Sequence, residues 1–349
     1  MKELRIKDIC DKGSSNLKQK DVEGKNGQYP VYGASGIISH IDTYHQEGNY
    51  IAVVKDGSGI GRVTFMPAKS SVIGTMQYIL PKEGFNINYI GYCLQSLDLS
   101  KYKQGAAIPH IYFRDYGERI VKVTENINEQ QSIVDYLDSA FAKIDAMKAN
   151  AEKALNEAKA LFQASLKEML EPKEGWDSIK LGDFAYMKAG DFVKASDIYQ
   201  NYAEGLYPCY GGNGFRGYVN EPNQEGDFCL IGRQGALCGC VNRAKGIFRT
   251  TEHAVIVKPY QDIPTSLVYY MLINLNLNKY ATGAAQPGLS VKNIAEQVII
   301  RVPPRNAHFT IAATLDSLKS KVDRLQENYE KISQECDALK QAILRQVFE

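Results

Sequence analysis

The sequence lacks any apolar run close to the roughly 18 residues that a membrane-spanning helix requires. Its first residues, MKELRIKDICDKG, contain no apolar segment of the kind found in a signal peptide. These absences argue against a membrane protein, and we expect the chain to be cytoplasmic. The 44% hydrophobic content suffices for buried cores, and 349 residues predict two or three domains.

Recognisable metal-ligand spacings are also lacking. The seven cysteines are scattered, and the closest pair, Cys238 and Cys240, forms C-x-C rather than the C-x2-C of a zinc site. The five histidines show no matched arrangement. We therefore expect no bound metal, and thiols that are reduced and mostly buried.

Catalytic signatures are absent too, including G-x4-G-K-[ST] and H-E-x-x-H. The glycines of residues 57–61 follow a G-x-G-x-G spacing, but a β-rich segment follows them rather than the helix that a nucleotide site needs. Three carboxylates recur at matching positions: Asp8 with Asp183, Glu47 with Glu225, and Asp138 with Asp316. Capping and turn roles explain these carboxylates better than catalysis does. We expect no catalytic residue, no cofactor and no enzymatic activity.

What the sequence does contain is an internal repeat at a spacing of 178 residues. Matching segments include Tyr29-Pro30 with Tyr207-Pro208, Tyr32-Gly33 with Tyr210-Gly211, Lys101-Tyr102 with Lys279-Tyr280, and Leu137-Asp138 with Leu315-Asp316. No gap is needed between residues 29 and 170, whereas the first residues match at 175. One repeat is a globular head plus a long helix, so we expect two similar heads.

Residues 128–170 and 308–348 show the alternating four- and three-residue apolar spacing of a coiled coil. Each helix of about 40 residues would be about 60 Å long. The first helix leads into the second head, so the second helix can cover the first only by running back. This predicts an antiparallel pair with one head at each end, related by an approximate two-fold axis; the alternative is that each helix packs on its own head. The predicted helix-pair interface consists of Ile133, Leu137, Ile144, Met147, Leu161, Ile311, Leu315, Leu318, Val322, Leu325, Ile332, Leu339 and Ile343.

The fold class is predicted to be α+β, with two tandem heads, two long antiparallel coiled-coil helices and an internal pseudo-two-fold. Strands are expected at residues 50–55, 62–65, 72–80 and 120–123, with copies at 228–233, 239–241, 252–257 and 298–302. Short helices are expected at 87–98 and 264–276. The predicted boundaries are 1–127 for the first head, 128–172 for the first long helix, 173–305 for the second head and 306–349 for the second long helix.

The net charge of +1 is unevenly distributed along the chain. Residues 1–127 carry 16 Lys/Arg and 13 Asp/Glu, and residues 175–305 carry 13 and 11. Residues 128–174 carry 6 Lys/Arg and 9 Asp/Glu, and residues 306–349 carry 6 Lys/Arg and 7 Asp/Glu. The heads are thus mildly basic and the helices mildly acidic, which is consistent with contact between the heads and a polyanion.

Comparison of the two copies separates scaffold residues from candidate recognition residues. Matched residues are mostly Gly, Pro, Tyr and apolar, whereas polar residues in the same loops differ: Lys55 faces Arg233, and Arg62 faces Cys240. One scaffold thus presents two sets of the side chains that read base edges, with neutral drift as the alternative. The candidate base readers are Lys55, Arg62, Arg216, Arg233, Gln234 and Gln286, supported by Asn213, Tyr32 and Tyr210. The candidate phosphate contacts are Lys101, Lys103, Lys279 and Lys292.

Several motifs, in this order, resemble the specificity (S) subunit of type I restriction–modification systems. Residues 176–184, WDSIKLGDF, are similar to the opening of a target recognition domain of that family. The segments YPVYG at 29–33 and YPCYG at 207–211 resemble its Y-P-x-Y-G motif, and GAAIP at 105–109 and GAAQP at 283–287 resemble its G-x3-P segment. EQQSI at 129–133 is similar to the start of its first long helix. The first head lacks the Trp and Leu-Gly of the opening motif, and the second helix keeps only Ile311 of its start.

The resemblance covers essentially the whole chain and implies a noncatalytic DNA-reading subunit. Each head, as a target recognition domain, would bind one half of a split target in double-stranded DNA. The helices would set the gap between the halves and dock two methyltransferase (M) subunits, and restriction (R) subunits are further partners that the family allows. S-adenosylmethionine, ATP and Mg would then be bound by those partners, and no membrane is involved.

Two alternatives from other classes stay open at this point. One is a noncatalytic coiled-coil adaptor whose two heads bind proteins. The other is a twin-headed enzyme, which would need a matched polar constellation that the two copies do not contain.

Overall fold

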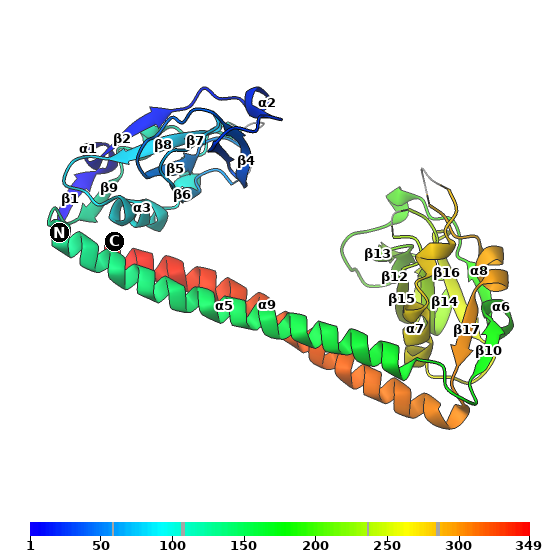
Figure 1. The fold of residues 1–349 in the computed structure, drawn as a ribbon. Helices are drawn as coiled ribbons and strands as arrows, with labels where there is room; N and C mark the ends of the chain where they lie inside the picture. Colours follow the sequence, from blue (N-terminus) through cyan, green and yellow to red (C-terminus); the bar gives the residue numbers. More distant parts are fainter. Residues whose placement is uncertain (58, 106–108, 236, 284–286) are drawn as a thin grey trace. The chain divides into compact units, whose positions relative to one another are not determined.

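The computed structural model describes residues 1–57, 59–105, 109–235, 237–283 and 287–349. The chain divides into unit 1, which contains Met1–Glu152 and Tyr329–Glu349, and unit 2, which contains Lys153–Asn328. Both units mix sheet and helix, and the long helices α5 (Ile127–Met169) and α9 (His308–Phe348) each contribute a part to both units (Figure 1). The predicted α+β class with two tandem domains and two long helices is confirmed. No helix in the described ranges is long and apolar enough to span a membrane.

Unit 1 contains three sheets in its described part. The first has the order β2 (Cys10–Ser14), β8 (Met76–Pro81), β5 (Tyr50–Val54) and β6 (Val63–Met66). The second has the order β4 (Gly36–Ile41), β3 (Tyr29–Gly33) and β7 (Ser71–Val72), and the third pairs β1 (Lys2–Arg5) with β9 (Ile120–Val123). Every residue of β5 is buried, because Ile51 and Val53 belong to one core cluster and Tyr50, Ala52 and Val54 to another, so both faces of the strand are covered.

The longest helix in the globular part of unit 1 packs on the four-stranded sheet and helps to complete the core. The longest helix of the globular part is α3 (Ile87–Ser96), and the short ones are α1 (Ile6–Ile9), α2 (Gln19–Val22), η1 (Leu99–Tyr102) and α4 (Phe113–Tyr116). Asn86 caps α3, since its side chain accepts hydrogen bonds from the backbone N–H groups of Asn88 and Tyr89. The buried core joins residues of β5, α3, α5 and the end of α9, and Phe348 lies 5.2 Å from the ring of Tyr89.

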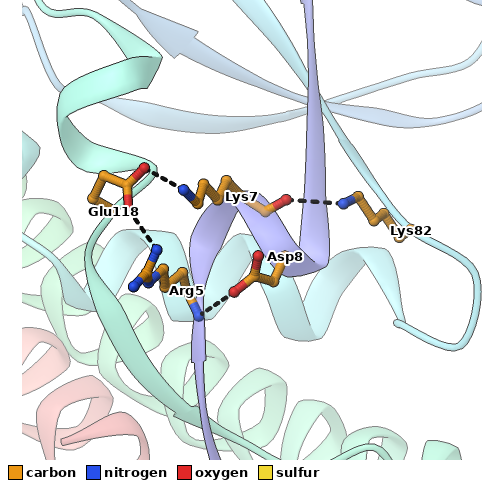
Figure 2. A network of polar contacts seen from close by, with 5 residues as sticks. All are labelled: Arg5, Lys7, Asp8, Lys82 and Glu118. Atoms are coloured by element: carbon orange, nitrogen blue, oxygen red, sulfur yellow. Dashed lines mark hydrogen bonds and ion pairs between the residues drawn. The ribbon is translucent and has the colours of Figure 1, made fainter.

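Polar contacts fix the short helix α1, as Figure 2 shows. The Asp8 carboxylate accepts a hydrogen bond from the Arg5 backbone N–H at 3.2 Å. The side chains of Arg5 and Lys7 both contact the Glu118 carboxylate, and Lys82 Nζ donates to the Lys7 carbonyl at 2.9 Å. The predicted capping role of Asp8 is therefore confirmed.

Unit 2 contains one larger sheet in place of two. Its order is β11 (Ala185–Ala189), β16 (Ala254–Pro259), β14 (Gln224–Gly232), β15 (Val241–Thr250), β12 (Tyr207–Gly211) and β13 (Gly214–Val219). A separate pair is formed by β10 (Asp177–Lys180) and β17 (Ile299–Val302). The helices are α6 (Leu181–Phe184), η2 (Ala195–Asp197), α7 (Thr265–Asn274), η3 (Leu277–Tyr280), α8 (Val291–Gln297) and η4 (Arg305–Ala307).

A proline explains why the two units differ in their sheets. Strand β15 spans the residues equivalent to β6, β7 and the segment between them. Pro67 lies in that segment of unit 1, where Lys245 of unit 2 pairs with Asp227 in the ladder. Proline has no backbone N–H to donate to the hydrogen-bond ladder of a sheet, so strand β6 of unit 1 ends at Met66. The following N–H, of Ala68, donates instead to the Asn49 side chain at 2.8 Å.

The repeat is visible in the strand register. Tyr29 faces Ile41 and Tyr207 faces Val219, with a bulge after residue 31 in the first pair and after residue 209 in the second. The closing strands β9 and β17 match at a spacing of 179 residues, one more than the rest of the repeat. Ile120 pairs with Arg5, and Ile299 pairs with the equivalent residue, Lys180. The expectation of a gap-free match from residue 29 to 170 is therefore wrong by one residue at this strand.

Within each unit, the local parts of α5 and α9 pack against each other in antiparallel fashion. In unit 1, Lys148 contacts Asp337 and Lys340 contacts Asp145, so residue numbers fall along one helix as they rise along the other. In unit 2, Lys159 Nζ donates to Gln326 Oε1 at 2.7 Å. Seam residues at predicted positions are buried or half-buried: Ile133, Leu137, Ile144, Ile311, Leu315, Leu318, Val322, Leu325, Ile332 and Ile343.

Three predicted interface residues are wrong: Met147, Leu161 and Leu339 are 59%, 61% and 47% exposed. Leu155 and Phe162 are buried instead, and the stems of Lys148 and Lys340 lie at the seam. One of the two predicted heptad positions in α5, that of Leu137 and Ile144, is buried. The other, that of Met147 and Leu161, lies one residue before the side chains that face the seam, those of Lys148 and Phe162. The aliphatic stem of a lysine can occupy a seam while its ammonium stays in water, and a hydrophobic pattern does not detect this.

A tyrosine–aspartate hydrogen bond joins the globular part of each unit to its long helices. Tyr92 on α3 donates to Asp138 on α5, and Tyr270 on α7 donates to Asp316 on α9 at 2.8 Å. The two pairs are equivalent in the repeat. Asp138 and Asp316 thus anchor a tyrosine, rather than serving the capping or turn role that the sequence suggested.

Candidate functional site

Three loops of unit 1 meet at one place, defined here as loop cluster 1: residues 32–36, 54–57 with 59–62, and 103–105 with 109–111. The Ile111 N–H donates to the Lys55 carbonyl at 3.0 Å, and the Gly57 N–H to the Pro109 carbonyl at 3.5 Å. Arg62 Nη1 donates to the Ala34 carbonyl at 3.0 Å. These bonds connect the second loop to the other two.

Unit 2 builds the equivalent loop cluster 2 from residues 210–214, 232–235 with 237–240, and 281–283 with 287–289. The Leu289 N–H donates to the Arg233 carbonyl at 2.8 Å, and the Gly235 N–H to the Pro287 carbonyl at 3.0 Å. Cys240 Sγ lies 2.8 Å from the Gly212 carbonyl oxygen. The same backbone bonds thus form twice, although the side chains differ.

Glycine is required where the middle loop passes the next element. Gly61 and Gly239 have φ of +85° and +91°. A methyl group at Gly61 would lie 2.7 Å from the Ser100 backbone nitrogen, and one at Gly239 would lie 2.5 Å from that of Asn278. These glycines therefore let the loop pack on η1 or η3.

Arg62 and Cys240 occupy equivalent positions and perform the same local task. Each side chain contacts a carbonyl of the first loop, that of Ala34 or that of Gly212. Arg62 was predicted to read bases. The structure shows that one of its guanidinium nitrogens already ties two loops together.

Loop cluster 1 carries an acid–histidine pair. His110 Nδ1 contacts the Asp56 carboxylate. The His110 ring lies 4.1 Å from the Tyr112 ring, and the Arg114 guanidinium lies 4.5 Å from the centre of that tyrosine. Gln234 and Gly288 replace Asp56 and His110 in unit 2, so this chemistry belongs to the first cluster.

Loop cluster 2 carries a denser set of charges. Burial raises the pKa of the Cys209 thiol on β12, while Arg216 and Arg249 lower it and Glu252 raises it again. Glu252 Oε1 lies 3.1 Å from His253 Nε2. Side chains of both charges therefore lie near Cys209, the residue that precedes the first loop of the cluster.

The structure places most of the predicted DNA contacts in these clusters or beside them. In unit 1, Tyr32 and Lys55 are half-buried in the loops, Arg62 is exposed, Lys101 lies on η1, and Lys103 begins the third loop. In unit 2, Tyr210, Asn213 and Arg216 surround the first turn, Arg233 and Gln234 lie in the second loop, and Lys279 lies on η3. Lys292 lies on α8, 4.0 Å from Glu296 of the same helix. Gln286 lies outside the described residues.

Sequence reasoning missed Thr251, Glu252 and His253, which connect β15 to β16 beside Arg233. The Arg233 N–H donates to the His253 carbonyl at 3.0 Å, just as the Lys55 N–H donates to the Thr75 carbonyl at 2.9 Å. The available signal was the replacement of Gly74-Thr75 by Glu252-His253 within the repeat. Among the described residues, no group of three or more His, Cys, Asp or Glu could hold a metal ion.

Comparison with known proteins gives one matching family. Residues 1–157 and 173–334 match the family described as type I restriction modification DNA specificity domain. The type I restriction enzyme EcoprrI specificity subunit of Escherichia coli is 44% identical over 148 residues, which is 42% of this chain and 37% of that relative. The matched part is thus well under half of the relative's length.

Solved structures share the fold at low sequence identity. An S subunit of a type I restriction–modification system from M. genitalium aligns over 100% of this chain and 96% of its own, with 19% identity and a TM-score of 0.52. A chain whose structure is described as showing the structural basis of complex assembly and conformational transition of the type I R-M system aligns over 98% of this chain and 96% of its own. It has 16% identity and a TM-score of 0.75. The HsdS subunit from Thermoanaerobacter tengcongensis aligns over 98% and 95%, with 16% identity and a TM-score of 0.53.

Proposed function

The chain belongs to the type I restriction modification DNA specificity domain family, and from this premise we propose that it is the DNA-reading subunit of a type I restriction–modification complex. Loop cluster 1 would read one half of a split double-stranded target, and loop cluster 2 the other half.

The observation that carries the proposal is one loop scaffold built twice with different polar side chains. The backbone bonds at Lys55 and Arg233 are equivalent, yet cluster 1 offers Asp56 and His110 where cluster 2 offers Gln234 and Gly288. Hydrogen-bonding side chains on a fixed backbone are what direct readout in the major groove requires. Two such sites in one chain suit a target with two unlike halves.

The long helices would set the gap between the half-sites and dock two methyltransferase subunits. We assign no catalytic step to this chain. Methyl transfer from S-adenosylmethionine would occur on the methyltransferase subunits, and ATP and Mg would be used by a restriction subunit. A solved structure of similar fold, described in terms of assembly of the type I R-M system, supports the expectation of partner subunits.

Co-expression with the methyltransferase subunit of the same restriction–modification system, followed by methylome sequencing, tests the proposal. We expect the purified complex to contain both proteins, and one split motif with two unlike halves to be methylated. Methylation only at an unsplit motif, or no association between the proteins, would contradict it. A preference of the chain for polyanions that is lost at moderate salt would separate DNA binding from a protein-binding adaptor.

A further inference from the structure

The connection between β15 and β16 consists of three polar residues and is hydrogen-bonded to the backbone of Arg233 in loop cluster 2. Thr251, Glu252 and His253 form this connection. The Arg233 N–H donates to the His253 carbonyl at 3.0 Å, and the Thr251 N–H donates to the Tyr210 carbonyl at 2.9 Å. The connection therefore touches both the first and the second loop of the cluster.

Polar atoms at this place are shielded from solvent without hydrogen-bond partners. Within the described part of the chain, Arg233 Nε, Glu252 Oε2 and His253 Nδ1 make no hydrogen bond. Glu252 Oε1, in contrast, lies 3.1 Å from His253 Nε2. Shielded polar atoms in folded proteins are nearly always paired, so these unpaired atoms show that the side chains keep hydrogen-bonding capacity that the fold itself does not use.

The equivalent place in unit 1 shows that the scaffold does not need these side chains. The Lys55 N–H donates to the Thr75 carbonyl at 2.9 Å, which reproduces the bond made by Arg233. Lys55 replaces Arg233, and Gly74 replaces Glu252. The Glu252 carboxylate is therefore an addition to a fold that forms without it, whereas the position of Arg233 carries a cationic donor in both units.

Resting on the proposed function, we propose that Arg233 and Glu252 together read one guanine–cytosine pair in the half-site bound by unit 2. The terminal nitrogens of the Arg233 guanidinium would donate to O6 and N7 of guanine, and the carboxylate of the partly exposed Glu252 side chain would accept from the N4 amino group of cytosine. Guanine presents two acceptors side by side to the fork of an arginine, whereas adenine presents one acceptor beside a donor. This complementarity favours a G·C pair over an A·T pair.

The test uses the full chain co-expressed with its methyltransferase, and compares the methylomes of Arg233→Ala, Glu252→Ala and the unaltered protein. Both variants are expected to relax the same single G·C position in one half-site, with roughly 5- to 150-fold loss of discrimination there. The other half-site is expected to stay unchanged. Lys55→Ala, the matched control, is expected to affect only that other half-site.

A chemical probe tests the same contact without any substitution. Replacing the assigned guanine by 7-deazaguanine removes the N7 acceptor and is expected to weaken DNA binding by the unaltered complex, but not by the Arg233→Ala complex. If a variant fails to assemble, indifference of the unaltered complex to 7-deazaguanine at every guanine of both half-sites overturns the proposal.

The remaining outcomes separate this inference from the proposed function. Three results with an assembled and active complex would overturn the reading of a G·C pair but not the proposed function. The variants could relax an A·T pair, they could relax two different pairs, or they could relax none. Absence of any split methylated motif with the unaltered protein would overturn the proposed function, and the inference with it.

Discussion

At the scale of single residues, the two tyrosine–aspartate bonds show how each globular part is held to its helices. Burial raises the pKa of Tyr92, with further increases from its bond to Asp138 and from nearby charge. Burial and Asp316 raise the pKa of Tyr270 in the same way. The neutral phenol is thus the form that the fold stabilises in both units.

Replacing Tyr92 by Phe should lower the free energy of unfolding of unit 1 by about 1 kcal/mol, because the ring packing stays and one hydrogen bond is lost. Tyr270→Phe should do the same in unit 2. Urea unfolding of each variant measures the loss. Combining Tyr92→Phe with Asp138→Asn should cost less than the two single changes added together, and strict additivity would show that the bond contributes nothing.

The cysteines lead to a second prediction at this scale. Six of the seven are buried, and only Cys240 is half-buried. Burial raises the pKa of Cys10 and that of Cys229 to about 12, so these thiols stay protonated near neutral pH. A thiol reagent should modify Cys240 first in the native protein and all seven after denaturation. Peptide mass spectrometry would identify the modified residue, and equal early labelling of Cys10 would contradict the expectation.

At the scale of elements, the seam between α5 and α9 offers a matched pair of leucines in unit 2. Leu155 is 3% exposed and Leu161 is 61% exposed. Leu155→Ala should lower the free energy of unfolding by about 2–5 kcal/mol, since it leaves a cavity. Leu161→Ala should change it by less than about 0.5 kcal/mol. Urea titrations of the two variants would reveal whether the seam has been assigned to the right face.

Most elements could be predicted from local pattern, because apolar runs, glycines and prolines act on their immediate neighbours. Strand β5, helix α3 and both long helices follow from such signals. The continuous strand β15, which joins two sheets into one in unit 2, could not be predicted, because it depends on a single residue, Pro67 against Lys245, within a long-range pairing. The candidate loops were recognisable through the repeat. The position of Glu252 and His253 beside Arg233 was not, because it depends on how two distant strands align.

At the scale of the whole molecule, buried tyrosines make stability depend on alkaline pH. Burial raises the pKa of Tyr89 to about 12 and raises those of Tyr50 and Tyr116 as well. These phenols ionise near pH 10 in an unfolded chain. Above about pH 10 the unfolded state therefore releases protons that the folded state keeps, and the free energy of unfolding falls as pH rises. Urea midpoints that stay constant from about pH 8 to about pH 11 would contradict this.

The continuous helix α5 begins in unit 1 and ends in unit 2, which suggests a test of the proposed gap setting. Inserting seven residues in α5 and seven in the facing part of α9 preserves the seam repeat and adds about 10 Å. The gap in the methylated motif should grow by about three base pairs, with both half-sites unchanged. A new half-site with the old gap would contradict the proposed role of the helices. An insertion in α5 alone, the control, should weaken the pairing of the helices.

The composition of unit 1 has a consequence for synthesis on the ribosome. The unit needs residues 329–349, and Leu344 and Phe348 fill its core beside Tyr89 and Leu137. At ordinary translation rates these residues emerge roughly 10 to 35 s after Glu152, once all of unit 2 has been made. Until then the apolar core side chains that Leu344 and Phe348 cover stay exposed in the nascent first domain, whereas all residues of unit 2 have already been made. A chain interrupted before residue 329 would therefore expose these core side chains to chaperones and proteases.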